Sequence, residues 1–401
     1  MPAGDIPQRI NRKGAEIMAN AGAARGRQRK IKYYTQYDFM LLFMTIALAL
    51  FGVLMIYSAS SYVAMYKFNN PYRFVKQQLI GMGAGILCML FVSNQDYQLF
   101  VLKLPGTKMR LAEVTYWIAL FMQTIVLIPG IGIAHNGSRR WLGAGPLQFQ
   151  PSEITKIAVI LLVADIAYRN RKMFDSYKGL IGIAIYILLP TGLIAVQNLS
   201  TALTVAGIGF GMAFVASRKK WLFVILPAVA FVVVWLYIKI GGGYRMNRIT
   251  AWRNVETSDK GFQILQGLYA IASGGLFGSG LGQSMQKLGY IPEAYNDMIF
   301  AVICEELGLV GAVVLMFAFL VLLWRIMIIA CNAPDIFGSM ICVGVMVHIA
   351  VQVILNIAVV TNTIPSTGVP LPFISYGGTA SAIMMAEMGL VLGVSRQIKL
   401  K

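Results

Sequence analysis

The chain has 401 residues, of which 58% are hydrophobic and only 12% are charged, and its formal net charge is +18. Soluble globular proteins carry about 25% charged residues, so this chain cannot form an ordinary water-facing surface. The composition excludes a cytosolic enzyme, a secreted disulfide scaffold and a disordered protein, and it predicts a polytopic membrane protein.

The basic residues lie in short segments between apolar runs. This pattern is typical of membrane topology and does not indicate a nucleic-acid partner. The four cysteines form no CxxC pair, so neither a metal site nor a disulfide framework is indicated. Residues 1–37 are polar and basic, and they predict a disordered cytoplasmic tail.

Ten apolar runs approach the length of about 20 residues that a transmembrane helix needs. In chain order they lie near 38–60, 74–94, 112–133, 152–168, 179–196, 199–217, 221–239, 298–324, 336–360 and 374–395. Only Gln197 and Asn198 separate the fifth run from the sixth, and merging the two would reverse the topology downstream. With ten spans and an inside N-terminus, most lysines and arginines fall on the inside, as the positive-inside rule requires.

We therefore expect an all-α polytopic membrane protein with ten transmembrane helices over residues 38–396 and both termini in the cytoplasm, including residues 397–401. Residues 240–297 form a long outer loop between the seventh and eighth spans, and loops of this length tend to be functional. Within it, GFQILQGLYAIASGG (261–275) has the spacing of an amphipathic helix at the membrane surface. GGLFGSGLG (274–282) does not follow a strand, so it predicts a tight turn and not a nucleotide site.

Ionisable residues inside the predicted spans are few, which argues against an ion carrier. Asp165 is interpreted as a paired or interfacial residue, His348 as a packing residue, and Glu387 as a hydrogen-bonding group between helices. Glu305 and Glu306 are adjacent and point about 100° apart on a helix, so they cannot face one site.

The outer loops are net basic, contrary to the usual bias, which indicates an anionic ligand such as a phosphate. Binding of lipid headgroups is the alternative. The candidate groups are Arg139 and Arg140 beside Trp141, together with Arg245, Arg248, Arg253 and Lys287.

Two acidic residues on the outer side have suggestive settings. Asp297 ends GYIPEAYND, directly before the eighth span. Partial desolvation at this boundary makes a carboxylate a better base, whereas the helix N-terminus favours a capping role. Glu153 and Lys156, in QPSEITK, share one helix face and either orient a substrate phosphate or close the helix end.

Four segments, in this order along the chain, resemble the SEDS family (shape, elongation, division and sporulation) of polytopic glycosyltransferases. They are NGSRRWLGAGPLQFQPSEITK (136–156), NLSTAL (198–203), the segment 261–311 and IPSTGVPLPFISYGGTAS (364–381). The chain looks most like the FtsW-like division branch, and the elongation (RodA) and sporulation (SpoVE) branches remain alternatives.

The resemblance implies polymerisation of lipid II into β-1,4 glycan strands at the outer face of the bacterial cytoplasmic membrane, for septal wall synthesis in cell division. The family's essential acidic residue falls on Asp297, where we expect the catalytic base. The residues expected to bind substrate are Arg140, Trp141, Ser152, Glu153, Lys156, Arg248 and Lys287. The sequence departs from the family pattern at Asn198, which replaces an acid, and at Tyr295 and Asn296, which precede Asp297.

The resemblance also implies partners. These are lipid II, a class B penicillin-binding protein and other membrane proteins of the division machinery. No cofactor is certain, and assistance from a divalent cation is left open. A lipid II flippase and a non-catalytic scaffold for division proteins are the competing functions.

Overall fold

The computed structural model describes residues 37–135, 138–144, 147–221, 223, 250, 252–256 and 261–398. The predicted tail up to residue 36, most of the predicted span 221–239, and the candidate residues Arg245 and Arg248 lie outside the described residues.

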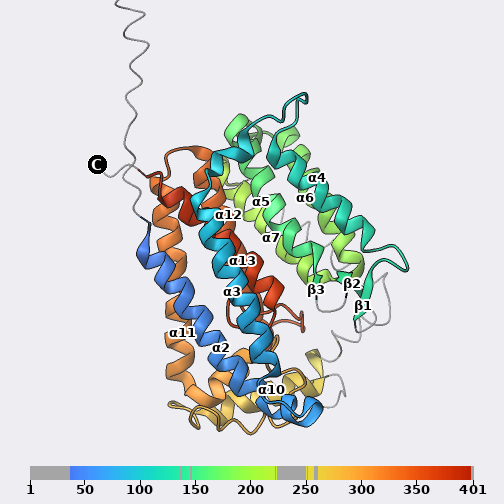
Figure 1. The fold of residues 1–401 in the computed structure, drawn as a ribbon, viewed down its shortest axis with the longest axis vertical. Helices are drawn as coiled ribbons and strands as arrows, with labels where there is room; N and C mark the ends of the chain where they lie inside the picture. Colours follow the sequence, from blue (N-terminus) through green and yellow to red (C-terminus); the bar gives the residue numbers. More distant parts are fainter. Residues whose placement is uncertain are drawn as a thin grey trace, which may run out of the picture. The chain divides into compact units, whose positions relative to one another are not determined.

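The described part of the chain is mainly helical (Figure 1). Its helices are α2 (Phe39–Phe68), α3 (Arg73–Asn94), α4 (Leu111–Ile125), α5 (Pro151–Arg169), α6 (Tyr177–Gln197), α7 (Leu199–Ala216), α10 (Phe262–Gly274), α11 (Ile299–Asn332), α12 (Ile336–Val360) and α13 (Gly378–Ser395), with short 3-10 helices η1 (Tyr97–Val101) and η2 (Arg171–Asp175). Each predicted span other than 221–239 overlaps one of these helices. Among the described residues, seven helices are long and apolar enough to cross a membrane.

The boundary between α6 and α7 lies at Asn198, where the sequence left most doubt. Its backbone is extended, so it ends α6, and its side chain accepts a hydrogen bond from the Thr201 amide at 3.2 Å. Asparagine is among the best residues at such a cap because its side-chain oxygen satisfies a free amide of the first turn. The predicted fifth and sixth spans are therefore two helices, which pack against each other.

Helix α12 is central in the bundle and packs against α5, α7, α11 and α13, while α13 also packs along α3 (Figure 1). At one end of the bundle, Asp335 accepts hydrogen bonds from Tyr97 and Gln98. At the other end, Asp297 lies beside the segment that joins α12 to α13. We call these the Asp335 end and the Asp297 end.

A small sheet at the Asp297 end was not expected from the sequence. Strands β1 (Ile133–His135), β2 (Ser138–Ala144) and β3 (Leu147–Phe149) pair antiparallel in the order β1-β2-β3. The predicted third span, 112–133, is also shorter than expected, because α4 ends at Ile125. Pro129 and Gly130 follow, and Gly130 adopts a φ of +93° that ends the helical course. The apolar run thus continues into a turn and a strand.

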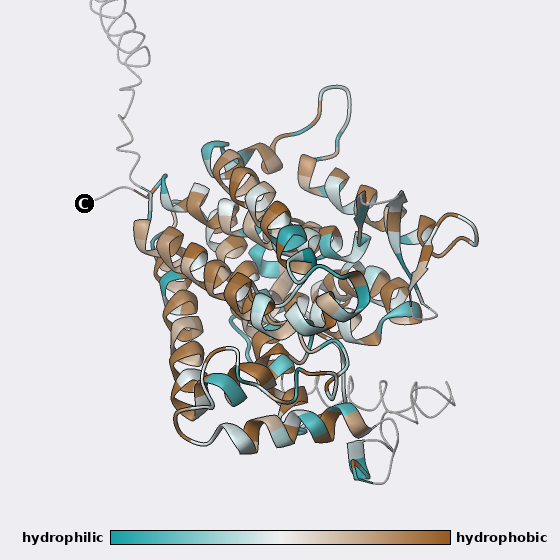
Figure 2. Ribbon diagram, turned by 60° about the horizontal axis from the view of Figure 1, so that its bottom comes forward, coloured by the Kyte–Doolittle hydropathy of each residue, from teal (hydrophilic) through white to brown (hydrophobic). Residues whose placement is uncertain are grey.

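Large apolar side chains remain exposed along the outside of the helices. Ile80, Leu87 and Phe317 are 73%, 70% and 64% exposed, and the helices in Figure 2 are coloured mainly hydrophobic. Such continuous apolar surface is costly in water but is the natural surface of a helix in lipid. The exposure pattern supports a bundle embedded in a membrane.

Helix α11 is interrupted at Gly308, whose φ of +68° and ψ of −169° are not helical. The segment 275–280 fills the interruption: the amides of Ser279 and Gly280 donate to the carbonyls of Glu305 and Glu306 at 2.9 and 3.0 Å. In the other direction, the amides of residues 309 and 310 donate to the carbonyls of residues 275 and 276. We call this paired region, residues 274–280 with 304–310, the Gly308 joint. It satisfies backbone groups that a broken helix would otherwise leave bare in the membrane.

Glycines make the Gly308 joint possible. A Cβ atom on Gly278 would lie 2.1 Å from the Glu306 carbonyl oxygen, and Gly278 has a φ of +80°. We predict that Gly278→Ala lowers the free energy of unfolding by at least about 1–3 kcal/mol, from backbone strain before the steric clash is counted. Thermal unfolding of the detergent-purified protein measures this loss.

Gly83→Ala is the matched control, because a Cβ atom there meets nothing within 4 Å and the residue lies inside α3. Alanine is the better helix former, so Tm should stay the same or rise. An equal Tm for the two variants would contradict the role of Gly278 in the joint.

Candidate functional site

Asp297 lies in the turn before α11, which begins at Ile299 with Met298 at its N-cap. The residue is half-buried. The Asn356 side chain on α12 donates from Nδ2 to the carbonyl oxygens of both Asp297 and Val369, each at 2.8 Å. A Cβ atom on Gly368 would lie 3.6 Å from Asp297 Oδ2. One amide side chain thus fixes the backbone of Asp297 against residues 368 and 369.

Residues 361–377, which we call the α12–α13 loop, meet several helices at the Asp297 end. The Ser200 hydroxyl, in the first turn of α7, donates to the Thr367 carbonyl, and the Tyr376 amide donates to the Tyr295 carbonyl at 3.0 Å. Phe373 is buried and adopts a φ of +63°, which costs a non-glycine residue about 1–3 kcal/mol. The loop is therefore held in one conformation by its surroundings.

A small pocket lies under the α12–α13 loop. Its volume is about 30 Å³, room for ordered water but not for a saccharide. Its lining joins α5, α12, α13 and the loop through Glu153, Gln352, Ser381 and residues 370–373 and 375–377. The predicted Glu153 and the loop beside Asp297 therefore belong to one connected region.

The structure pairs Glu153 with Lys156 as the sequence predicted. Lys156 Nζ lies 2.8 Å from Glu153 Oε2, and the two residues are 1% and 9% exposed. Ser152 is also buried, and its hydroxyl has no hydrogen-bond partner within the described residues. Burial of an ammonium group is unfavourable unless an opposite charge lies beside it, so Glu153 offsets the cost of burying Lys156 next to the pocket.

Arg140 and Trp141 lie on β2 at the same end of the bundle. The Arg140 guanidinium donates from Nε to the Gln197 carbonyl, the last residue of α6, at 3.1 Å, and from Nη2 to the Ser138 hydroxyl at 3.3 Å. Arg140 is half-buried. Because Gln197 lies three residues before Ser200, these contacts connect the sheet to the start of α7, which holds the α12–α13 loop.

Lys287 is placed differently from Arg140 and Lys156. It is 5% exposed, and its ammonium group contacts Glu306 and Ser58 in the bundle interior. Arg248, the remaining predicted binding residue, lies outside the described residues. The structure thus brings Asp297 and the α5 residues Ser152, Glu153 and Lys156 to elements that meet at the α12–α13 loop, and Arg140 is connected to the same region through Gln197 at the end of α6.

Aromatic side chains surround the backbone just before Asp297. The ring of Tyr295 lies 4.4 Å from that of Phe74 and 5.6 Å from that of Tyr376 between centroids. Burial, followed by the charge of Glu293, raises the pKa of Tyr295 to about 12. The phenol stays protonated at neutral pH, so Tyr295 does not serve as a base beside Asp297.

Two residues of this region were missed in the sequence. Asn356 and Gln352 follow His348 at intervals of four along α12, so all three share one helix face. Polar residues at helical spacing inside an apolar span indicate a functional site, so Gln352 and Asn356 could have been predicted from the sequence. His348 itself pairs with Glu387 on α13, Nδ1 to Oε2 at 2.7 Å, which confirms the expected bond from Glu387 between helices.

Within the described ranges, no group of three or more His, Cys, Asp or Glu side chains could hold a metal ion.

The comparisons with known proteins agree on one family. The family model for cell cycle proteins of the FtsW, RodA and SpoVE type matches residues 39–400. Stage V sporulation protein E of Bacillus subtilis is 40% identical over 366 residues, 90% of this chain and 98% of that protein. A probable peptidoglycan glycosyltransferase FtsW of Trichlorobacter lovleyi is 38% identical over 375 residues, 91% of this chain and 94% of the relative.

Solved structures show the same fold. A chain from a peptidoglycan synthase complex matches with a TM-score of 0.74 and 26% identity, covering 90% of this chain and 98% of that one. The rod shape determining protein RodA of Thermus thermophilus matches with a TM-score of 0.66 and 26% identity, covering 92% of this chain and 99% of that one. The chain therefore belongs to the FtsW, RodA and SpoVE family of multi-pass membrane proteins.

Proposed function

We propose that this protein is a peptidoglycan glycosyltransferase that polymerises lipid II into β-1,4 glycan strands at the outer face of the cytoplasmic membrane. Family membership and the names of its FtsW relatives support the reaction. The observation that carries the proposal is the position of Asp297, fixed through Asn356 at the point where α11, α12 and the α12–α13 loop meet.

Asp297 takes the role of general base. The 4-hydroxyl of the acceptor GlcNAc attacks the anomeric carbon of the donor, and the bond from that carbon to the pyrophosphate breaks. Asp297 accepts the hydroxyl proton, and undecaprenyl pyrophosphate leaves. A single displacement inverts the anomeric centre and gives the β-1,4 linkage. The half-buried position of Asp297 supports this role because partial exclusion of water makes a carboxylate a stronger base.

Cationic side chains stabilise the charge that develops on the leaving group. We assign this role to Arg140, whose guanidinium can present two donors to a phosphate, and to Lys156. Trp141 and Ser152 lie beside them on β2 and at the start of α5 and would contact the sugar or the pyrophosphate. Glu153 keeps Lys156 charged and in place through their 2.8 Å ion pair.

The alternatives fit the molecule less well. A flippase needs a hydrated, charged path across the bundle, but most interior ionisable groups that the structure describes are paired with each other, and Glu305 is satisfied by the Ser284 hydroxyl and two backbone amides. Asp165 contacts Arg110 and Arg169 at 2.7 and 2.6 Å, and His348 contacts Glu387. A scaffold would not require the strained α12–α13 loop beside Asp297 or the buried Lys156 that pairs with Glu153.

The long segment before α11 then faces the outside, both termini lie in the cytoplasm, and the enzyme works at the division septum. A class B penicillin-binding protein that cross-links the strands is the proposed partner, and other division proteins assemble with the pair. The similarity to a chain of a peptidoglycan synthase complex supports such a partner. Residues 1–37 and 397–401 would be cytoplasmic extensions of the helical domain 38–396.

Asp297→Asn tests the reaction directly. Because the amide cannot accept the proton, we predict a loss of roughly 10²–10⁴-fold in the rate of lipid II polymerisation, the usual contribution of a general base. The rate is measured by gel analysis of glycan strands with the purified protein and its penicillin-binding partner. Asp297→Glu keeps a carboxylate and should retain part of the activity. Full activity of folded Asp297→Asn protein would refute the role of Asp297.

Asn356→Leu tests how Asp297 is held. Leucine has a similar size but cannot donate, so two carbonyl oxygens lose a partner, at a cost of about 1–3 kcal/mol each when buried. We predict a lower Tm and a lower polymerisation rate. The control is Asn332→Leu at the Asp335 end, where the exposed side chain bonds only within α11; it should leave the rate unchanged. Equal rates for the two variants would contradict the positioning role of Asn356.

A further inference from the structure

We propose that Lys287 and Glu306 are positioning residues for Asp297, joined as a buried ion pair that fixes the segment carrying the base. This inference rests on the proposed glycosyl transfer. It replaces the substrate contact expected for Lys287 from the sequence.

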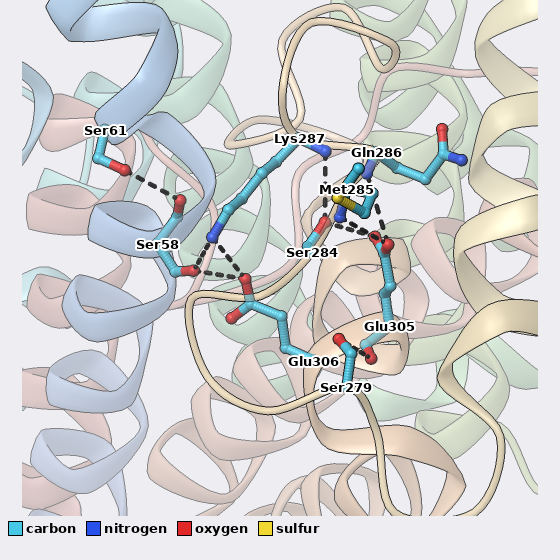
Figure 3. Close-up of polar contacts among 9 residues, drawn as sticks. All are labelled: Ser58, Ser61, Ser279, Ser284, Met285, Gln286, Lys287, Glu305 and Glu306. Carbon is cyan, nitrogen blue, oxygen red and sulfur yellow. Dashed lines mark hydrogen bonds and ion pairs between the residues drawn. The ribbon is translucent and has the colours of Figure 1, made fainter.

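The ion pair also contacts a distant part of the chain, α2, through Ser58 (Figure 3). Lys287 Nζ is 2.8 Å from Glu306 Oε1 and 2.9 Å from the Ser58 hydroxyl on α2. The Ser58 hydroxyl in turn donates to Glu306 Oε1 at 2.6 Å. These three residues connect the segment before Asp297, the first part of α11 and α2.

Burial excludes a direct role for the Lys287 ammonium at an open substrate site. Its side chain is 6% exposed, and that of Glu306 is fully buried. A phosphate ligand would have to replace Glu306 as the partner of Lys287, which would leave a fully buried carboxylate without a cation. Lys156 differs because the side chain of its partner Glu153 is 12% exposed and lines the pocket under the α12–α13 loop. A buried carboxylate without a cation is strongly unfavourable in the interior of a bundle. The pair is therefore part of the structure that holds the site.

Glu305 adds a second attachment for the same segment. Its carboxylate accepts hydrogen bonds from the Ser284 hydroxyl and from the amides of Met285 and Gln286, the latter two at 2.8 and 3.4 Å. Glu305 and Glu306 thus point to different partners, as their spacing predicted, but both hold residues 284–287 (Figure 3). Both glutamates also belong to the Gly308 joint.

The held segment leads directly to the base. From Lys287 the chain runs ten residues to Asp297, with buried anchors at Ile291 and Ala294 and a hydrogen bond from the Ile291 amide to the Gln286 carbonyl at 3.0 Å. Asp297 is then followed by the part of α11 that contains Glu306. The chain before Asp297 and the chain after it are therefore both held by the Lys287–Glu306 pair. Because this pair also contacts Ser58, it fixes the position of Asp297 relative to α2.

A double-mutant cycle tests the inference with Lys287→Met, Glu306→Met and the double variant, measuring kcat and KM for lipid II polymerisation. Each single variant leaves one buried charge without its partner, which displaces the segment. A misplacement of about 1 Å costs roughly 10²-fold in rate. We expect kcat to fall by about that factor in both single variants with KM unchanged, and the double variant to be no worse than either.

Two outcomes would overturn the inference. A higher KM in Lys287→Met beside normal kinetics in Glu306→Met would show that Lys287 binds the substrate. Multiplicative losses of kcat in the double variant would show that the two residues act independently. Lys67→Met, a change at an exposed lysine in the last turn of α2, is the control and should be as active as the unmodified protein.

Lys287→Arg keeps the inference testable if a single variant does not fold. Arginine retains the charge but cannot occupy the same contacts as a lysine ammonium, so a positioning role predicts a lower kcat with unchanged KM. A substrate-binding role predicts an equal or lower KM, because arginine is a good phosphate ligand. A KM that falls without loss of kcat would overturn the inference.

The unmodified protein and Asp297→Asn are measured in the same assay. If the unmodified protein polymerises lipid II and Asp297→Asn does not, the proposed function stands whatever the Lys287 variants show. No polymerisation by the unmodified protein with its partner, or full activity of Asp297→Asn, would instead count against the proposed function itself.

Discussion

A charge buried among apolar helices needs an opposite charge beside it, and this constraint determines how the interior of the protein is arranged. In the described part of the bundle the buried lysines each contact a glutamate: Lys156 with Glu153 and Lys287 with Glu306. The first pair keeps a cation beside the proposed leaving group. The second holds the chain segment that carries the proposed base. The same requirement for charge pairing thus accounts for the proposed catalytic cation in one pair and for the position of a chain segment in the other.

Buried backbone amides and carbonyls likewise need partners, in their case hydrogen-bond partners. The interruption of α11 at Gly308 would leave bare carbonyls and amides, and residues 275–280 supply their partners. As a result, the amphipathic helix α10 and the glycine-rich turn after it are tied to α11 only a few residues beyond Asp297. A broken helix is tolerated in a membrane only where other protein satisfies its backbone. Here that protein is the segment leading to the site.

The α12–α13 loop completes the site from the opposite direction. Its carbonyl oxygens accept hydrogen bonds from Asn356 and Ser200, and its Tyr376 amide donates to the Tyr295 carbonyl. Phe373 holds a strained conformation within it. Strain of this kind persists only where the surroundings fix it, and it is common at functional sites. The loop joins the elements that carry Glu153 and Asp297, which are far apart in the sequence.

The sequence by itself determined the membrane class, the helices other than the one expected at 221–239, the amphipathic helix 262–274 and the pairing of Glu153 with Lys156. These features follow from composition, apolar run length and spacing within one helix, all of which are local. The sheet at 133–149 was not expected, because two of its strands have only three residues each and so leave no periodic signal. Only the tertiary structure decided that Lys287 meets Glu306 and Ser58, that Asn356 holds Asp297, and that His348 meets Glu387. Those contacts join residues 19 to 229 positions apart, and only the packing of the helices brings such residues within hydrogen-bonding distance.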